Sequence, residues 1–146
     1  MQLTIYTDYS LRVLLYLATV PRPSLTSIRE ISDSYNISYH HLTKVAHELA
    51  KTGLITTIKG RNGGIRLAKD PEDINLGWVV RQTEDNLDLV ECFNAEKNTC
   101  ILSGRCRLKG VLKEALHAYL SVLDKYTLAD MLTNPEELSL LLKTLK

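Results

Sequence analysis

Apolar residues in the first part of the chain recur every three to four positions, which is the spacing of one helix face. Residues 6–21 predict a first helix that stops at Pro21. Residues 25–36 predict a second, shorter helix that begins after Thr26 or Ser27. The inward positions of these two helices are Leu11, Leu14, Leu15, Ala18, Ile28 and Ile31.

A third helix is marked at both ends, because Ser38 is a favourable N-cap and Gly53 is a typical C-terminal glycine. Its buried face is predicted to carry Leu42, Val45, Ala46 and Leu49. Two short helices, a tight turn and a longer helix form the unit that places its last helix in a DNA major groove.

Two runs rich in β-forming residues, 54–59 and 64–68, follow this helix and flank the tetrapeptide Gly-Arg-Asn-Gly at 60–63. Asn-Gly is a strong signal for a type I′ turn, in which both central residues have positive φ. On its own this segment is equally consistent with a solvated turn. After three helices, a basic hairpin indicates the wing of a winged helix-turn-helix domain.

Side chains at the start of the third helix and at the tip of the wing are the candidate DNA contacts, since these positions reach base edges and phosphates. They could also be ordinary surface residues. The candidates are Ser38, Tyr39, His40, Thr43, Lys44, Lys59, Arg61 and Asn62.

The second half begins with a short predicted helix over 72–85, in which Trp78 is expected to anchor the core beside Ile74, Val79 and Gln82. Residues 91–106 predict a loop because they are polar and rich in turn formers. The expected fold is therefore mainly α with a small β-hairpin wing. Its divisions are a DNA-binding domain (1–70), a connecting helix with the cysteine loop (71–107), and a dimerisation helix with a C-terminal helix (108–146).

A long helix from Leu108 onward carries apolar residues at alternating four- and three-residue intervals. It could simply cover its own domain, but DNA-binding domains of this type usually bind two-fold operators as dimers. We therefore expect a homodimer. A capped turn at 127–132 and a final helix with Asn134 as N-cap and Pro135 at its first position complete the chain. The apolar positions of the long helix are Leu108, Leu112, Ala115, Tyr119, Val122 and Tyr126.

Composition and charge indicate where the protein is located and what kind of partner it binds. The chain has 146 residues, 45% of them hydrophobic, and no apolar run of membrane-spanning length, so we expect a cytoplasmic globular protein with no membrane partner. The net charge of +1 hides an asymmetry: residues 1–69 carry nine basic and four acidic residues, whereas the remainder is net acidic. A basic half favours contact with a phosphate backbone.

All three cysteines, Cys92, Cys100 and Cys106, fall within fifteen residues. Buried inert thiols are one interpretation, but a polar loop with basic neighbours favours a thiolate site. Zinc would need a fourth ligand, and the nearest downstream histidine, His117, lies on the long helix. Iron-sulfur clusters are also held by thiolates and accept an unusual fourth ligand.

The chain resembles the Rrf-type family of bacterial winged-helix regulators, and within it the repressors that sense nitric oxide. The resemblance runs nearly from end to end. It rests on residues 3–18, 37–55 and 59–74, the three-cysteine loop, and the TLADML motif at 127–132.

The resemblance implies a repressor, not an enzyme, that binds a two-fold double-stranded operator as a homodimer. It also implies one 4Fe-4S cluster per subunit, bound by the three cysteines and by Asp8 of the partner subunit. Arg12 would support that aspartate. Nitrosylation of the cluster would release DNA.

Two alternatives remain. A regulator of the same family could sense oxygen or cluster status, although sister regulators with a 2Fe-2S site place a histidine where this chain has Lys109. A cysteine-based redox protein or enzyme is the alternative from another class, but no nucleotide loop, His-Cys pairing or paired carboxylates support it.

Overall fold

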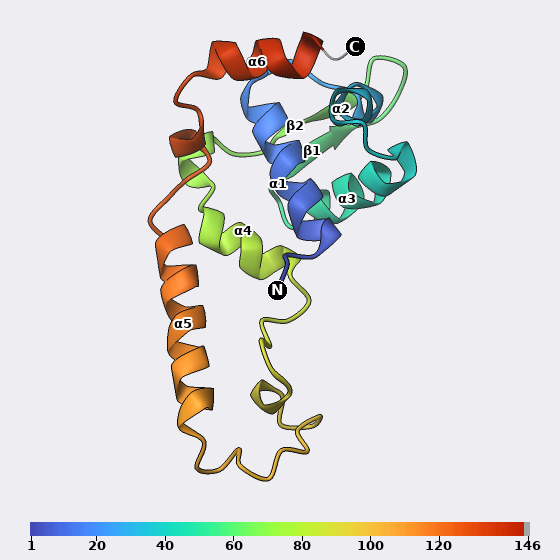
Figure 1. Ribbon diagram of the computed structural model, residues 1–146. Coiled ribbons are helices and arrows are strands. Elements are labelled where there is room, and N and C mark those ends of the chain that lie inside the picture. Colours follow the sequence, from blue (N-terminus) through green and yellow to red (C-terminus); the bar gives the residue numbers. More distant parts are fainter. Residues whose placement is uncertain (145–146) are drawn as a thin grey trace.

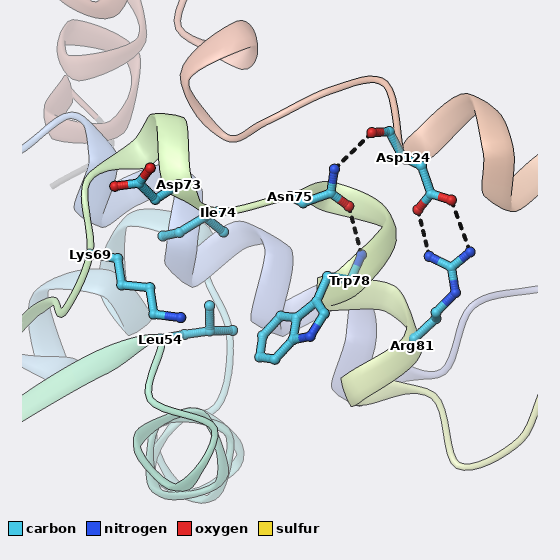
Figure 2. A pocket seen from close by; sticks show the side chains of 8 residues that line it. All are labelled: Leu54, Lys69, Asp73, Ile74, Asn75, Trp78, Arg81 and Asp124. Atoms are coloured by element: carbon cyan, nitrogen blue, oxygen red, sulfur yellow. Dashed lines mark hydrogen bonds and ion pairs between the residues drawn. The ribbon is translucent and has the colours of Figure 1, made fainter.

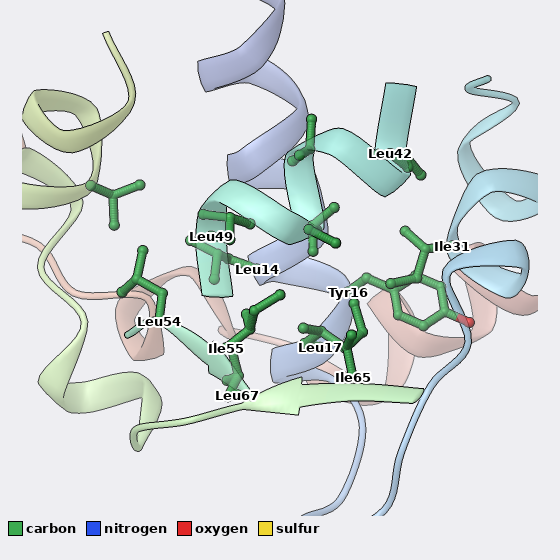
Figure 3. Packing of buried hydrophobic residues seen from close by; sticks show 14 of the residues in the cluster. Leu14, Tyr16, Leu17, Ile31, Leu42, Leu49, Leu54, Ile55, Ile65 and Leu67 are labelled. Carbon is green, nitrogen blue, oxygen red and sulfur yellow. The ribbon is translucent and has the colours of Figure 1, made fainter. Parts of the chain in front are cut away.

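The apolar faces of the first three helices meet around one core in the computed structural model, which describes residues 1–144 (Figure 1). These helices are α1 (Ile5–Ala18), α2 (Ile28–Tyr35) and α3 (Tyr39–Lys51). Figure 3 shows their side chains interleaved above the wing. The fully buried residues of these helices include Leu14, Ile31, Leu42 and Leu49.

Polar caps fix where each of these helices begins. The side chain of Ser27 accepts a hydrogen bond from the backbone N of Glu30 (3.1 Å), and Ser38 caps α3 in the same way. The prediction of Ser38 as N-cap is confirmed, and Ser27 rather than Thr26 caps α2. Such caps satisfy backbone donors that have no partner inside the helix.

The buried face of α3 is the predicted one, whereas that of α1 differs from the prediction. Of the four predicted inward residues only Leu14 is buried, and Leu11, Leu15 and Ala18 are partly buried. The reason is that α1 packs against α3, the strand Gly64–Leu67 and the helix Leu76–Thr83 at once, so residues outside the predicted stripe are covered. The buried apolar residues of α1 are Val13, Leu14, Tyr16 and Leu17.

The wing is an antiparallel pair, β1 (Ile55–Ile58) and β2 (Gly64–Leu67). The predicted type I′ turn is wrong, because neither Asn62 nor Gly63 is among the residues with positive φ. The strand pairing ends at the pair Ile58 and Gly64, and Gly60 has the positive φ (110°) instead. The loop is thus longer than a two-residue turn and presents more of its backbone and side chains.

A further pair of backbone hydrogen bonds ties the wing to the helices. Thr26 donates to the carbonyl of Ile65 (2.9 Å) and accepts from the amide of Ile65 (2.8 Å). Because Thr26 directly precedes the cap of α2, these bonds attach the wing directly to the start of the second helix.

In the second half of the chain, α4 (Leu76–Thr83) packs against α1, and α6 (Pro135–Thr144) packs against α2. Between them, α5 (Arg107–Leu123) and the segment that precedes it extend away from this core (Figure 1). Leu145 and Lys146, the end of the predicted final helix, lie outside the described residues. Three short 3-10 helices lie at Pro71–Asp73, Glu91–Phe93 and Ala129–Met131.

Two predictions in this half need correction. Trp78 is not a core anchor, since 37% of it is exposed, and Gln82 is also exposed; Val79 and Val80 take the inward positions of α4. The long helix ends at Leu123 and not at Tyr126, because the carbonyl of Tyr126 accepts a hydrogen bond from the amide of Leu76 (3.0 Å).

The two predictions near the C-terminus are confirmed. Thr127 donates through its backbone N to Asp130 (2.8 Å), which caps the turn at 127–132. Asn134 accepts from the backbone N of Glu137 (3.3 Å) and so caps α6. Within residues 1–144, no helix is both long and apolar enough to cross a membrane.

Candidate functional site

The recognition helix α3 has one buried face and one exposed face. Tyr39, His40, Thr43 and Lys44 are exposed along its first turns, and Ser38 is exposed at its cap. The wing residues Lys59, Arg61 and Asn62 are exposed as well. The structure therefore leaves all eight predicted DNA contacts accessible.

Arg29 joins this surface, although the sequence patterns did not single it out. Its guanidinium lies 4.2 Å from the ring centroid of Tyr39, a cation–π contact. Thr43 donates through Oγ1 to the carbonyl of Tyr39 (2.8 Å). Arg29 belongs to α2, and the packing of α2 against α3 shows that it adds positive charge at the start of the recognition helix.

Arg66 differs from the other basic residues of the wing. It is partly buried, and its guanidinium donates to the carbonyl of Pro23 (3.3 Å). This contact holds the wing to the loop before α2, so Arg66 has a supporting position and not one at the tip.

The cysteine segment, residues 91–106, carries three free thiols. Cys92 lies in a single 3-10 turn, Cys100 is exposed, and Cys106 is the residue before α5. In the part of the chain that the structure describes, no three His, Cys, Asp or Glu side chains are close enough together to hold a metal ion. A single chain thus supplies the thiols in one segment but does not gather them into a ligand set.

Local turns, and not packing, shape this segment. Asn94 accepts through Oδ1 from the backbone N of Glu96 (2.9 Å), and Asn98 accepts from that of Cys100 (3.0 Å). Between the last two cysteines, Ile101 and Leu102 are 96% and 63% exposed. A polar segment that is held by short-range bonds can close around a group that binds it.

The chemistry of this donor set fits an iron-sulfur cluster. Thiolate sulfur is the ligand these clusters use, and no disulfide consumes the three thiols. Cys106 lies at the N-terminus of α5, where the helix dipole favours a negatively charged ligand. The segment also contains the carboxylates Glu91 and Glu96, both exposed.

Asp8 belongs to the first turn of α1. In Figure 1, α1 lies in the helical core, away from the segment that precedes α5 in the same chain. Both carboxylate oxygens accept hydrogen bonds from Arg12, each at 3.0 Å. The predicted pairing of these two residues is therefore present. The carboxylate remains partly exposed, with 45% of its side chain accessible.

Arg12 in turn contacts Tyr9 in its own helix and Tyr35 at the end of α2. Its guanidinium lies 5.7 Å from the ring centroid of Tyr9 and 5.9 Å from that of Tyr35. Tyr35 donates its hydroxyl to the carbonyl of Arg12 (2.8 Å), and burial raises the pKa of Tyr35 to about 12 although Arg12 opposes this. Tyr9 lies 6.4 Å, ring to ring, from His41 in the first turn of α3. Asp8 is thus connected to the recognition helix through Arg12 and then Tyr9, which faces His41.

Glu84 holds the N-terminus of α1 from the end of α4. Its carboxylate accepts from the backbone N and the hydroxyl of Thr4 and from the hydroxyl of Thr7 (2.6 Å). Burial alone would raise the pKa of Glu84, but these hydrogen bonds bring the pKa below its ordinary value. The segment that leads into the cysteines therefore starts at a residue, Glu84, that is hydrogen-bonded to the start of α1, the helix that carries Asp8.

The long helix α5 exposes most of its predicted apolar stripe. Leu120 is its only buried residue, whereas Leu108, Tyr119 and Val122 are 62%, 42% and 51% exposed. Large apolar side chains in a row on one face typically mark an interaction surface. The stripe does not cover the domain of its own chain.

A three-helix core, an exposed recognition helix and a basic wing define a winged helix-turn-helix transcriptional regulator. Residues 3–134 match the Rrf2 family, described as iron-dependent transcriptional regulators. The chain belongs to this family, and it is a regulator rather than an enzyme.

Similar proteins support this assignment. The chain is 70% identical over 143 residues to the HTH-type transcriptional regulator NsrR of Halalkalibacterium halodurans and 57% identical to that of Bacillus subtilis, covering 98% of each chain. Among solved structures, IscR from T. potens has a TM-score of 0.74 at 26% identity, covering 94% of this chain and 90% of that one. CymR, the global cysteine regulator of B. subtilis, has a TM-score of 0.70 at 27% identity, covering 90% and 95%.

Proposed function

We propose that this chain is a cytoplasmic, homodimeric repressor that responds to nitric oxide through a 4Fe-4S cluster. In each site, Cys92, Cys100 and Cys106 of one subunit and Asp8 of the partner subunit would hold the cluster. The observation that carries the proposal is the set of three free thiols in one segment of a winged-helix regulator. The likeness to regulators named NsrR supports it.

The exposed apolar stripe of α5 supports the proposed dimerisation. Its apolar residues repeat at alternating four- and three-residue intervals, the pattern by which two helices pack along one seam. Burying that stripe against a second copy removes apolar surface from water, which favours association. A dimer also presents two recognition helices to a two-fold operator.

The residues of the DNA-binding surface have separate tasks. His40, Thr43 and Lys44 would reach base edges from the first turns of α3, and Tyr39 would be held in place by Arg29. Lys59 and Arg61 would neutralise phosphates beside the wing. The first group would supply sequence preference and the second would supply affinity.

Asp8 and Arg12 are suited to report whether the site is complete. When bound, the cluster would supply iron that reacts with nitric oxide. Asp8 would hold that iron through one carboxylate oxygen, and Arg12 would position the carboxylate through the other. Without this link both oxygens of Asp8 accept from Arg12, whose contacts with Tyr9 and Tyr35 lead toward α3. Loss of the link between subunits would then lower the affinity for DNA.

A mixed dimer tests whether Asp8 acts across the interface. One subunit carries Asp8→Ala, and the other carries Ser in place of all three cysteines. If Asp8 binds in trans, this dimer keeps one complete site, and its visible absorption and nitric-oxide response match those of one wild-type site. Each mutant homodimer serves as a control, because neither holds a complete site. A mixed dimer with the spectrum of the Asp8→Ala homodimer would refute the arrangement.

A further inference from the structure

The end of α5 is fastened to α4 by side chains that also shape α4 (Figure 2). The carboxylate of Asp124, the residue after α5, accepts two hydrogen bonds from Arg81, at 2.5 and 3.0 Å. Asn75 caps α4 by accepting from the backbone N of Trp78 (2.9 Å) and donates to the carbonyl of Asp124 (2.8 Å). We use the name joint for four residues: Asn75, Gly77, Arg81 and Asp124. We use the name arm for residues 84–126, which include the cysteine segment, α5 and, near their end, Asp124.

The joint is anchored to the DNA-binding core on its other side. Just beyond Asp124, Leu128 donates through its backbone N to the carbonyl of Ile74 (2.8 Å). Ile74 and Leu128 are buried in the same apolar cluster as the recognition helix. The position of the arm at this point is therefore fixed relative to α3.

Gly77 provides the space in which the ion pair lies. A Cβ at this position would come within 1.9 Å of Asp124 Oδ1 and 2.9 Å of an Arg81 nitrogen. Glycine inside a helix is less favourable than alanine because its unfolded chain has more freedom. Gly77 therefore lowers the helix propensity of α4 at a position where any side chain would push Asp124 away.

Most of the arm beyond the joint has little attachment to its own core. Leu120 is the only buried residue of α5. A helix of this length spans about 26 Å, so a tilt of roughly 10° at the joint moves its far end by about 4 Å. The planar Arg–carboxylate fork restricts orientation more than a single hydrogen bond does.

We propose that the joint sets the angle between the arm and the recognition helix, and thereby the spacing of operator half-sites that the dimer prefers. The inference rests on the proposed dimeric DNA binding through the arm. Two recognition helices on one face of DNA must match half-sites one helical turn apart, so a small change of angle at the joint alters which spacing fits.

A structural role alone would give a different result. The Arg81–Asp124 pair is partly exposed, with 39% and 42% of the side chains accessible. Pairs of this kind contribute little to stability. Removing one partner should leave the melting temperature within a few degrees of wild type while it changes the preferred spacing.

The test uses a DNA duplex that anaerobically purified wild-type protein selects from a random pool. Duplexes with the half-site spacing reduced or increased by one base pair are then compared with it. The proteins are wild type, Arg81→Ala, Asp124→Ala and the exchanged pair Arg81→Asp/Asp124→Arg. Arg81→Lys keeps the charge but not the fork. Circular dichroism and melting temperature confirm folding of each variant.

Wild type should prefer one spacing by on the order of tenfold, the effect of one poorly fitted contact set. Arg81→Ala and Asp124→Ala should reduce that preference to about threefold or less, Arg81→Lys should fall between, and the exchanged pair should restore it. Single variants that keep the wild-type profile, lose affinity equally at every spacing, or are not rescued by the exchange would overturn the inference. If wild type selects no DNA, the proposed function itself fails, which is a separate result.

Discussion

The core formed around α1, α2, α3 and the wing differs from the arm, residues 84–126, in how complete it is within one chain. In the core, three capped helices and a paired wing bury their apolar residues against one another. In the arm, apolar side chains such as Ile101 and Val122 face solvent, and three thiols are free. The core is therefore complete within one chain, whereas on the proposed function the arm would be completed by a second copy and a bound cluster.

The largest difference between the two regions should come from the cysteines. Cys100→Ser should abolish the visible absorption of anaerobically purified protein, because a hydroxyl replaces a soft sulfur ligand. Far-UV circular dichroism of the core should stay unchanged. Ala95→Ser is the matched control, since it adds a hydroxyl at an exposed position of the same segment. Full absorption in Cys100→Ser would exclude this thiol as a ligand.

Stability should follow the opposite pattern. Leu49→Ala should lower the free energy of unfolding by about 2–5 kcal/mol, because Leu49 is fully buried and its loss leaves a cavity. Ile101→Ala should change it by about 0.5 kcal/mol or less, since Ile101 is 96% exposed. Chemical denaturation at one fixed protein concentration measures both. A large loss for Ile101→Ala in the cluster-free protein would mean that the arm packs on its own chain.

Dimerisation should depend on the stripe of α5. Val122→Asp should weaken self-association by on the order of a hundredfold, because it places an unpaired charge in an apolar interface. Val122→Leu keeps the side chain apolar and should dimerise like wild type. Sedimentation equilibrium separates the two results. An unchanged dimer in Val122→Asp would place the interface elsewhere.

Phosphate contacts by the wing should have a moderate effect. Lys59→Ala should weaken binding to different DNA sequences by similar factors and reduce the dependence of binding on salt by about one counterion. Lys125→Ala removes the same charge from the arm and should leave both unchanged. Fluorescence anisotropy at several salt concentrations provides the comparison. An effect of equal size in Lys125→Ala would mean that the core does not carry the DNA contacts alone.

The smallest effect concerns the tie between the two regions at Glu84. Hydrogen bonds from Thr4 and Thr7 make the pKa of Glu84 lower in the folded than in the unfolded chain. Their contribution to stability is therefore present above the unfolded pKa, near 4.5, and is lost as pH falls through the folded pKa. Glu84→Gln should show a shallower loss of stability below about pH 5 than wild type. Parallel pH profiles would contradict this.

Much of the core could be predicted from sequence because its signals are local. Ser38, Leu42 and Leu49 define a capped helix with one buried face, and the structure has it. The prediction of a type I′ turn was wrong, because the positive φ in this loop is at Gly60 and not at Asn62 and Gly63. Arg29 beside Tyr39 was missed, since no local pattern predicts which side chains α2 brings to α3.

The arm was harder to predict because its partners are not local. The apolar repeat of α5 indicated a long helix, yet its end at Leu123 depends on the bond between Tyr126 and Leu76. Trp78 was expected to be buried as a large aromatic residue, but it lines a cleft beside the joint with Lys69 near its ring. The cysteine spacing indicated a metal site, while the assignment of Asp8 as fourth ligand came from family resemblance and stays a prediction.

In the proposed mechanism, the state of the cysteine segment controls DNA binding by the core. The decisive measurement is an anaerobic titration of wild-type protein with its selected DNA, before and after addition of nitric oxide, with visible absorption recorded in the same samples. Affinity for DNA should fall as the absorption bleaches. Bleached protein that binds the DNA as tightly as before would show that the cysteine segment does not control DNA binding.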